Sequence, residues 1–360
     1  MINCVECGSP YPEDSIPFYC PTCQGVYSID FLPVFDPTKF GDEPGLWRYK
    51  YSFGLPSDST YSYLGEGDTP LVWKPIFGSE VGFKLEFLNP TGSFKDRGTS
   101  VLLSFLLSRG VNQVMDDSSG NAGSSLAAYA ASAGIKARIF VPAYASGPKR
   151  KQISSYGVDI VQVPGKRSEA KDAVVDAANQ GGVYASHALL PQGMPGYATA
   201  AYEIFEQIGG VPGTVIEPIG QGNLLLSMSK AFSSIFQAGF IDKVPQLIGI
   251  QASACAPIWK VFSTGDSDLS NLVEGETVAE GVRTLKPYRL SQIINEIQEC
   301  NGSILAVEED KILKGQSALA SLGLYVEPTS AIVWDVLGRV VGDVPEPIVV
   351  ILTGSGLKSS

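Results

Sequence analysis

The sequence predicts an α/β fold of two three-layer αβα domains, preceded by a short cysteine knuckle. From about residue 70 onward, short β-rich runs alternate with helical stretches, which is the pattern of βαβ units and a parallel sheet. The run EPIVVILTG near the C-terminal end is apolar almost without interruption, as expected of a strand buried on both faces. Four of the six cysteines fall within the first 23 residues, which sets this segment apart.

The composition limits the classes of function. The 360 residues carry a formal net charge of −11, and a chain of this length predicts two or three domains. The negative charge disfavours nucleic acids and anionic membrane surfaces, which bind basic patches. The sequence contains no run of 18 or more apolar residues, which a transmembrane helix would require. The N-terminus lacks the pattern of a secretion signal. We therefore expect a cytoplasmic protein that binds neither nucleic acid nor membrane.

Residues 1–25 predict a zinc-ribbon-like segment. Two C-x2-C pairs are separated by twelve residues, and they contain Cys4, Cys7, Cys20 and Cys23. Four thiolates at this spacing can complete a closed tetrahedron, so we expect a structural zinc ion with no open position for a substrate. The alternative is that the thiols only pack together without metal. Cys255 and Cys300 stand alone, and we expect both to be small buried hydrophobic residues.

The remaining elements are expected in chain order. An aromatic, Pro- and Gly-rich connector at about 26–64 precedes a strand within 82–88 and a helix at 94–110. Strand and helix pairs follow at 113–120 and 121–134, at 137–143 and 147–157, and at 159–165 and 168–181. The alternation resumes with a strand at 214–220, a helix at 224–239, a strand at 246–253 and the last strand at 346–354.

Three glycine-rich loops stand at expected strand ends, where open α/β sheets bind ligands. The loop NPTGSFKDRG places Lys95 at the start of a helix, whose positive terminus favours the free amine needed for imine formation; the alternative is a solvated lysine. Backbone N–H groups of residues 118–124 can hold a carboxylate, although an N-cap turn looks similar. Residues 220–224 can hold a phosphate or form a plain connector. They match neither a dinucleotide fingerprint nor a P-loop.

His187 is the single histidine of the chain. A His-rich metal centre is thereby excluded, and any His-based triad would have to use this residue. Catalysis must rest mainly on lysine, carboxylates, hydroxyls or a cofactor. His187 itself can touch a substrate or act as an acid near a leaving group, or it can be a hydrogen-bonded, partly buried structural residue.

Five sequence blocks together carry a family resemblance. In order they are GEGDTPL (65–71), NPTGSFKDRG (89–98), SSGNAG (118–123), GQGNLL (220–225) and TGSGLK (353–358). Their order and spacing over about residues 60–360 resemble threonine synthase, an enzyme of fold type II that depends on pyridoxal 5′-phosphate (PLP). The resemblance implies a tryptophan synthase β-like fold, with a large domain at 26–100 and 186–360 and a small domain at 101–185. It also implies an amino-acid substrate and a homodimer.

The resemblance assigns roles to particular residues. Lys95 would form the Schiff base with PLP and shuttle protons, Asn121 would bind the cofactor's 3-hydroxyl, and Thr353 would face the pyridine nitrogen. The cofactor phosphate would lie against Gly220, Gln221, Gly222, Asn223 and Leu224. The substrate would contact Ser118, Ser119, Gly120, Thr69 and His187. A hydroxyl at the pyridine nitrogen does not force protonation as an Asp would, which suits elimination and replacement more than transamination.

The sequence departs from the family at the block that helps bind the substrate phosphate. Gly193 and Ala198 stand where the family has Arg and Lys, and Ala122 replaces a Thr. Other basic residues that could compensate are Lys149, Arg150, Lys151 and Arg167. We expect a PLP-dependent lyase that converts O-phosphohomoserine to threonine and phosphate. The alternative is β-elimination or β-replacement on serine, threonine or a related amino acid, which needs no second phosphate site.

Two non-enzymatic hypotheses remain. The chain could be a non-catalytic PLP-fold scaffold or ligand sensor, but the intact lysine loop speaks against this. The knuckle could be a docking module, but residues 8–19 contain no Lys or Arg, which disfavours nucleic acid as its partner. Docking onto the catalytic body or onto another subunit fits this segment better.

Overall fold

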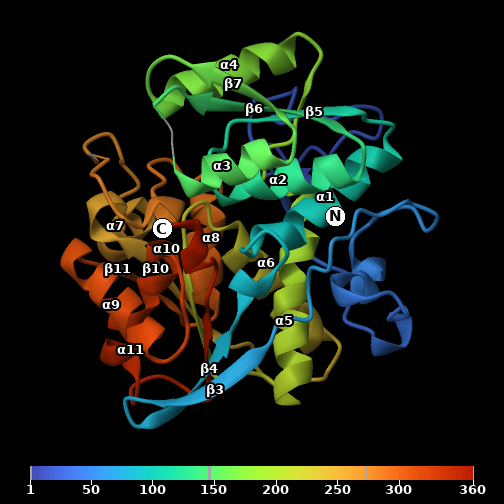
Figure 1. Cartoon of the computed structure of the whole chain (residues 1–360). Coiled ribbons are helices and arrows are strands. Elements are labelled where there is room, and N and C mark those ends of the chain that lie inside the picture. Colours follow the sequence, from blue (N-terminus) through green and yellow to red (C-terminus); the bar gives the residue numbers. More distant parts are fainter. Residues whose placement is uncertain (1, 145–146, 273, 360) are drawn as a thin grey trace.

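The structure is a computed structural model that describes residues 2–144, 147–272 and 274–359. It contains two large sheets and a small N-terminal ribbon (Figure 1). Among the described residues, no helix is both long and apolar enough to cross a membrane.

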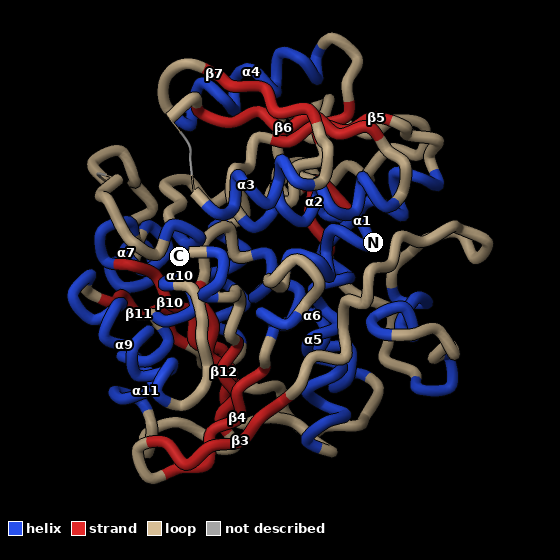
Figure 2. The backbone as a smooth tube through the Cα atoms, in the orientation of Figure 1, coloured by secondary structure: helices blue, strands red, loops and turns tan. Residues whose placement is uncertain are grey.

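The larger sheet has six strands in the order β11-β10-β9-β12-β4-β3, of which Figure 2 labels β11, β10, β12, β4 and β3. All neighbours are parallel except β3 and β4, which form an antiparallel hairpin. The strands are β3 (Leu71–Ile76), β4 (Ser79–Lys84), β9 (Thr214–Pro218), β10 (Gln246–Ala252), β11 (Ser303–Val307) and β12 (Ile348–Ile351). The strand expected within 82–88 thus ends at Lys84, and a short 3-10 turn, Glu86–Leu88, takes its second half.

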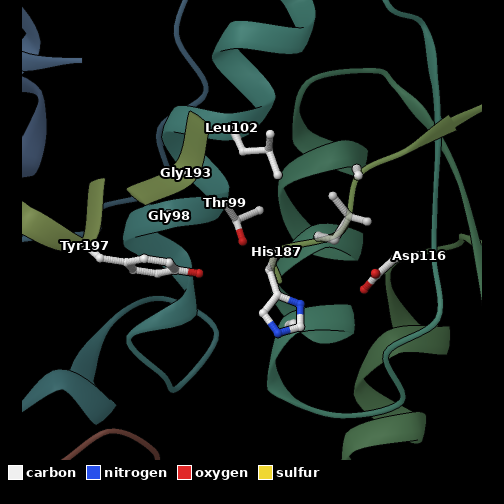
Figure 3. Close-up of a pocket in the computed structure, with 10 residues that line it drawn as sticks. Gly98, Thr99, Leu102, Asp116, His187, Gly193 and Tyr197 are labelled. Carbon is white, nitrogen blue, oxygen red and sulfur yellow. The ribbon is translucent and has the colours of Figure 1, made fainter. Parts of the chain in front are cut away.

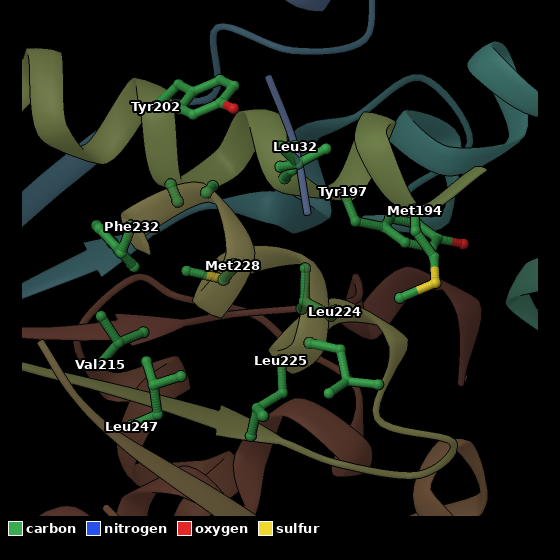
Figure 4. Close-up of a cluster of buried hydrophobic side chains, with 14 of the residues drawn as sticks. Leu32, Met194, Tyr197, Tyr202, Val215, Leu224, Leu225, Met228, Phe232 and Leu247 are labelled. Carbon is green, nitrogen blue, oxygen red and sulfur yellow. The ribbon is translucent and has the colours of Figure 1, made fainter. Parts of the chain in front are cut away.

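Helices cover both faces of this sheet. Val349 and Ile351 of β12 belong to one apolar cluster with residues of α5 (Met194–Ile208), α6 (Asn223–Gln237), α7 (Pro257–Thr264) and α8 (Leu290–Glu299), part of which is drawn in Figure 4. Ile348 and Val350 belong to a second cluster with α9 (Glu309–Ser321), α10 (Pro328–Ala331) and α11 (Val333–Val340). The terminal strand is therefore buried on both faces, as its apolar sequence predicted.

The smaller sheet has four parallel strands in the order β7-β6-β5-β8. The strands are β5 (Gln113–Asp116), β6 (Lys136–Pro142), β7 (Asp159–Val163) and β8 (Val183–Tyr184). Val114 packs with apolar residues of α1 (Lys95–Ser108), α2 (Asn121–Ser132) and α3 (Pro148–Ser155), whereas Met115 packs with α4 (Arg167–Asn179) on the other face. Each sheet is thus the middle layer of a three-layer αβα sandwich, and the predicted fold class is confirmed.

The N-terminal segment packs against this body. Strands β1 (Ile2–Cys4) and β2 (Tyr27–Ile29) pair in antiparallel fashion, so the ribbon's second strand lies just beyond residue 25. The connector that follows contains the 3-10 segment Gly45–Ser52 and buries four of its aromatic side chains, Phe35, Trp47, Tyr49 and Phe53. The ring of Phe35 lies 5.1 Å from that of Tyr202 on α5, so the connector wraps around the larger domain's helices.

Candidate active site

Lys95 is the first residue of α1, at the edge where the carboxyl ends of the strands meet. Its Nζ lies 4.3 Å from the centre of the Phe94 ring and 5.8 Å from that of Tyr197. Burial lowers the pKa of Lys95 to about 8, although the charges of Asp116 and Glu327 act in the opposite direction. A substantial share of the amine is therefore neutral near pH 7.5 to 8, which is the form that attacks an aldehyde.

A buried ion network fixes the first turn of α1. Arg97 donates from Nε to Glu86 Oε2 at 2.7 Å and from both terminal nitrogens to Glu203 of α5, each at 2.7 Å. Lys84 Nζ donates to Glu203 Oε2 at 2.7 Å. Two cations thus face two carboxylates, and the pKa of Glu203 is lowered chiefly by Arg97 against the effect of burial. Thr69 lies inside this network, where its hydroxyl donates to Glu86 and accepts from Arg97.

The loop between β5 and α2 carries the predicted carboxylate cradle. Ser118 Oγ accepts a hydrogen bond from the Gly120 N–H at 3.3 Å, and a side chain at Gly123 would collide with the Ser118 carbonyl oxygen at 1.8 Å. Ser119 and Gly120 are partly exposed at the tip. The glycine therefore permits a tight turn that leaves the tip open.

Asn121 faces a glutamate that sequence reasoning did not single out. Its Nδ2 donates to Glu327 Oε1 at 2.7 Å, and Glu327 pairs in turn with Lys149 Nζ at 2.8 Å. The Oδ1 of Asn121 is buried and has no hydrogen-bond partner among the described residues. An unpartnered acceptor at this position suits the 3-hydroxyl of PLP, because a buried polar atom is costly unless it is paired.

Thr353 follows β12 and lies next to the lysine loop. Its carbonyl oxygen accepts from the Phe94 N–H at 3.0 Å, and its Oγ1 is 2.9 Å from Ser330 Oγ. A β-bridge joins Ser93 to Gly354. The structure thus brings together Lys95, Asn121 and Thr353, which are far apart in the sequence.

The loop at 220–224 connects β9 to α6. Gly222 has φ of +77°, and a side chain there would meet Ile293 Cδ1 at 2.3 Å, so only glycine fits this turn. Asn223 Nδ2 donates to the His187 carbonyl oxygen at 2.8 Å, and Gln221 Oε1 accepts from the Tyr288 N–H at 3.1 Å. These contacts fix the loop and the first turn of α6, whose backbone N–H groups favour an anion.

Arg289 is a buried cation beneath this loop. It is 1% exposed, and it donates to Asn223 Oδ1 at 3.1 Å, to the carbonyls of Ala188 and Leu189 at 2.6 and 3.0 Å, and to the Tyr27 carbonyl from two nitrogens. Burial lowers its pKa to about 10. None of the salt bridges of the described residues pairs it with a carboxylate. Sequence reasoning missed this residue.

A small cavity opens beside Lys95, with room for about one water molecule. It lies between α1, α2, the ends of β5 and β8, and the start of α5 (Figure 3), and its labelled lining residues are Gly98, Thr99, Leu102, Asp116, His187, Gly193 and Tyr197. His187 is therefore one of the residues that line this cavity, and its role as a substrate contact stays a prediction. Asp116 was not predicted, although the pair of aspartates in QVMDDSSG was a visible signal.

The four N-terminal cysteines converge. All four Sγ atoms lie within 4.8 Å of one another, with 3.5 Å between Cys4 and Cys23 and 3.7 Å between Cys7 and Cys20. Tetrahedral zinc with Zn–S bonds of about 2.3 Å requires sulfur atoms about 3.8 Å apart, whereas a disulfide bond is about 2.05 Å long. The geometry therefore fits a closed metal site.

Comparison with known proteins identifies the family of the chain. Residues 63–354 match the model of the family described as pyridoxal-phosphate dependent enzymes. The chain therefore belongs to this family, and it is one of the family's threonine synthase-like members. It is 33% identical to a threonine synthase of Methanocaldococcus jannaschii and 31% identical to one of Methanosarcina acetivorans, in each case over 99% of this chain and 92% of the relative.

Solved structures share the fold. A T.th. threonine deaminase superposes with a TM-score of 0.68 at 23% identity, over 80% of this chain and 92% of the other. Maize serine racemase gives 0.69 at 20% identity, over 80% and 88%. At such identities the likeness establishes the shared α/β architecture, and the chemistry has to be argued from the residues of the site.

Proposed function

We propose that the chain is a PLP-dependent lyase that removes a substituent from Cβ or Cγ of an amino acid. The observation that carries the proposal is the place of Lys95 at the start of α1, where the preceding loop lies against Thr353 and Gly354 and burial lowers the pKa of the amine to about 8. When bound, the cofactor supplies the aldehyde for the lysine and a sink for negative charge at Cα. The unpartnered Asn121 Oδ1 and the glycine turn at Gly222 support its placement.

The residues of the chain divide the work between proton transfer and binding. The amine of Lys95 takes the proton from the substrate's Cα and can return one to the product. Ser118, Ser119 and Gly120 hold the α-carboxylate, and residues 220–224 hold the cofactor phosphate, with Arg289 adding a positive charge from below. The Thr353 hydroxyl, which lies 2.9 Å from Ser330 Oγ, would face the ring nitrogen of a bound cofactor without a negative charge, and this would favour elimination and replacement.

Two substrates follow from different observations. The relatives are named threonine synthase, which supports conversion of O-phosphohomoserine to threonine and phosphate. The block around α5 favours the second candidate, β-elimination or β-replacement on serine, threonine or a related amino acid. Gly193 offers only backbone to the cavity, and Ala198 is fully buried in the apolar cluster of α5 and α6, so neither supplies a cation for a phosphate.

The test uses purified protein loaded with PLP. Borohydride reduction followed by peptide mapping should place the pyridoxyl label on Lys95, and a label on another lysine would overturn the proposal. The same preparation is then given O-phosphohomoserine, serine and threonine separately. Threonine and phosphate would identify the first reaction, whereas a 2-oxo acid and ammonia would identify the second.

The cysteine knuckle, the assembly and the compartment belong to the same proposal. We infer that Cys4, Cys7, Cys20 and Cys23 hold a structural zinc ion, which the sulfur distances support. The domain boundaries 26–100 with 186–360 and 101–185, a homodimer and a cytoplasmic location remain predictions. Metal analysis and light scattering of the purified protein test the zinc ion and the dimer directly.

A further inference from the structure

Two buried polar atoms without partners lie in the cavity beside Lys95. Asp116, which ends β5, is 1% exposed, and its carboxyl group accepts from the backbone N–H groups of Asp117 and Ser118. Its Oδ1 has no hydrogen-bond partner among the described residues, and neither does the buried Nδ1 of His187. Figure 3 shows both side chains at the cavity. Unpaired polar atoms in a native interior call for an explanation, such as a ligand that completes them.

The cavity is placed to receive the side chain of a substrate held at Lys95. Gly98 and Thr99 lie one turn further along α1 and line its wall. Tyr197, whose ring centre is 5.8 Å from Lys95 Nζ, lies against Gly98 on the same side, and His187 and Asp116 lie across the cavity from it (Figure 3). With room for about one water molecule, it can take a single heavy atom such as an oxygen, but not a phosphate group.

The charges of the lining select a neutral hydroxyl. No Lys or Arg is among the residues that line the cavity, so no cation of the lining would contact a phosphate group placed there. Burial, together with the charge of the neighbouring Asp117, raises the pKa of Asp116 well above its ordinary value, which favours the protonated form of the carboxyl group. Burial also lowers the pKa of His187 well below its ordinary value, assisted by the charges of Lys95 and the exposed Arg167. The pair therefore offers one donor and one acceptor, which is the complement of a hydroxyl group.

We propose that Asp116 and His187 form the subsite for a hydroxyl on Cβ of the substrate, and that Asp116 is the acid that protonates the departing oxygen. The inference rests on the proposed PLP function and narrows its substrate to 2-amino-3-hydroxy acids of the size of serine or threonine. His187 Nδ1 accepts the hydroxyl hydrogen, and the Asp116 carboxyl donates to the hydroxyl oxygen.

The reaction step balances. The Lys95 amine takes the α-proton, and the electron pair of the Cα–H bond forms a double bond between Cα and Cβ. The Cβ–O bond breaks with both electrons going to oxygen, which takes the proton of Asp116 and leaves as water. Asp116 regains a proton from solvent, and Lys95 gives up the α-proton to solvent. After release, the enamine moves its N–H proton to Cβ and becomes an imine, which adds water and loses ammonia to give the 2-oxo acid.

The experiment separates removal of the α-proton from loss of the hydroxyl. PLP-loaded wild-type protein is incubated with serine in deuterated water; NMR follows deuterium at Cα, and a coupled assay follows the 2-oxo acid. Asp116→Asn should keep the visible cofactor band and the α-exchange but lower 2-oxo acid formation about 100-fold or more, the usual range for a general acid. Glu217→Gln is the matched control, because Glu217 is also a buried carboxyl without partners but does not line the cavity.

His187 gives an independent test. His187→Leu removes the acceptor and should raise the KM for serine about tenfold, the effect of one lost hydrogen bond to a buried group. His187→Asn can again accept from the substrate hydroxyl and should restore much of the loss. A purely structural role would make the two variants similarly defective.

Failure of this inference is distinct from failure of the proposed function. A wild-type protein that labels at Lys95 and releases phosphate from O-phosphohomoserine, but forms no 2-oxo acid from serine or threonine, would overturn the subsite and leave the PLP function standing. Equal loss of exchange and elimination in Asp116→Asn, or no loss of either, would also overturn it. Absence of any label at Lys95 would instead reject the function.

Discussion

Arg97 of α1 and Glu203 of α5 form a two-pronged ion pair with both N–O distances at 2.7 Å and no solvent exposure of either side chain. Arg97 lies two residues after Lys95, so the pair joins the first turn of the lysine helix to the neighbouring helix α5. Lys84 donates to the same glutamate. Glu203 thus balances two buried cations, and the orientation of Lys95 depends on it.

Removal of that glutamate should destabilise the whole protein. Glu203→Ala leaves Arg97 and Lys84 without their shared partner, and breaking a buried pair in this way costs about 3–5 kcal/mol of the free energy of unfolding. Urea denaturation monitored by circular dichroism measures the loss. Glu206→Ala on the same helix is the control, because its partner Arg48 is partly exposed and such pairs contribute about 1 kcal/mol or less. Equal losses in both variants would contradict a special role for the network.

Lys95→Ala should abolish the visible absorbance of lysine-bound cofactor and all turnover. The fold should survive, because the Lys95 side chain is absent from the ion network that fixes α1. Absorbance after dialysis against PLP, together with circular dichroism, checks both points. Lys136→Ala, at an exposed position at the start of β6, should keep the band. Retention of the band in Lys95→Ala would show that another lysine binds the cofactor.

Capture of PLP by the cofactor-free protein should depend on pH with a midpoint near 8. Burial lowers the pKa of Lys95 from 10.5 to about 8, so the reactive neutral amine increases as the pH rises through 8. The folded state also binds fewer protons than the unfolded state between pH 8 and 10.5, and this group therefore adds stability as the pH rises through that window. Stopped-flow absorbance from pH 6.5 to 9.5 measures the capture rate. A midpoint close to 10.5 would mean that the amine is fully solvated.

Cys20→Ser should release the metal and loosen the N-terminal segment. Cys20 is fully buried within the sulfur cluster, and loss of one of four thiolates weakens a structural zinc site strongly. Mass spectrometry of metals should find about one zinc per wild-type chain and far less in the variant. Cys255→Ser, away from the cluster, should leave the zinc content unchanged. Wild-type protein without zinc, purified in its presence, would reject the metal site.

Arg289→Met should weaken cofactor binding about tenfold or more. The substitution removes the donor to Asn223 and leaves three backbone carbonyls unpaired, each worth about 1–3 kcal/mol when buried. Titration of the cofactor-free variant with PLP gives the dissociation constant. Arg289→Lys keeps the charge and should recover part of the affinity for PLP. Equal loss of affinity in Arg289→Met and Arg289→Lys would mean that the shape and hydrogen bonds of the guanidinium matter, and that its charge does not.

Much of the fold was readable because it depends on local pattern. The apolar run of β12 and the alternation around β5 to α4 predicted buried parallel strands and their covering helices. The end of β4 was misjudged, because Glu86 lies in an apolar stretch but turns into a 3-10 segment to reach Arg97. The residues around Glu86 in the sequence do not indicate that the strand ends before it, because its partner Arg97 lies on another element.

The candidate site also contains some residues that local sequence predicts and others that it does not. Lys95 and the glycine loops were predictable, because tight turns at strand ends need small residues in sequence. Glu203 and Glu327 were not, since their partners Arg97 and Asn121 are 106 and 206 residues away, and a lone glutamate on a helix resembles a surface residue. Asp116 and His187 belong together only because β5 and β8 are neighbours in the sheet.

The hydrogen bonds from Arg289 to the Tyr27 carbonyl oxygen connect the N-terminal ribbon directly to the loop at 220–224. A shortened chain that begins after the ribbon would expose a guanidinium that is otherwise shielded from water and would tilt Asn223 along with it. Efforts to trim this enzyme to a minimal catalytic unit would therefore have to redesign position 289 together with the deletion.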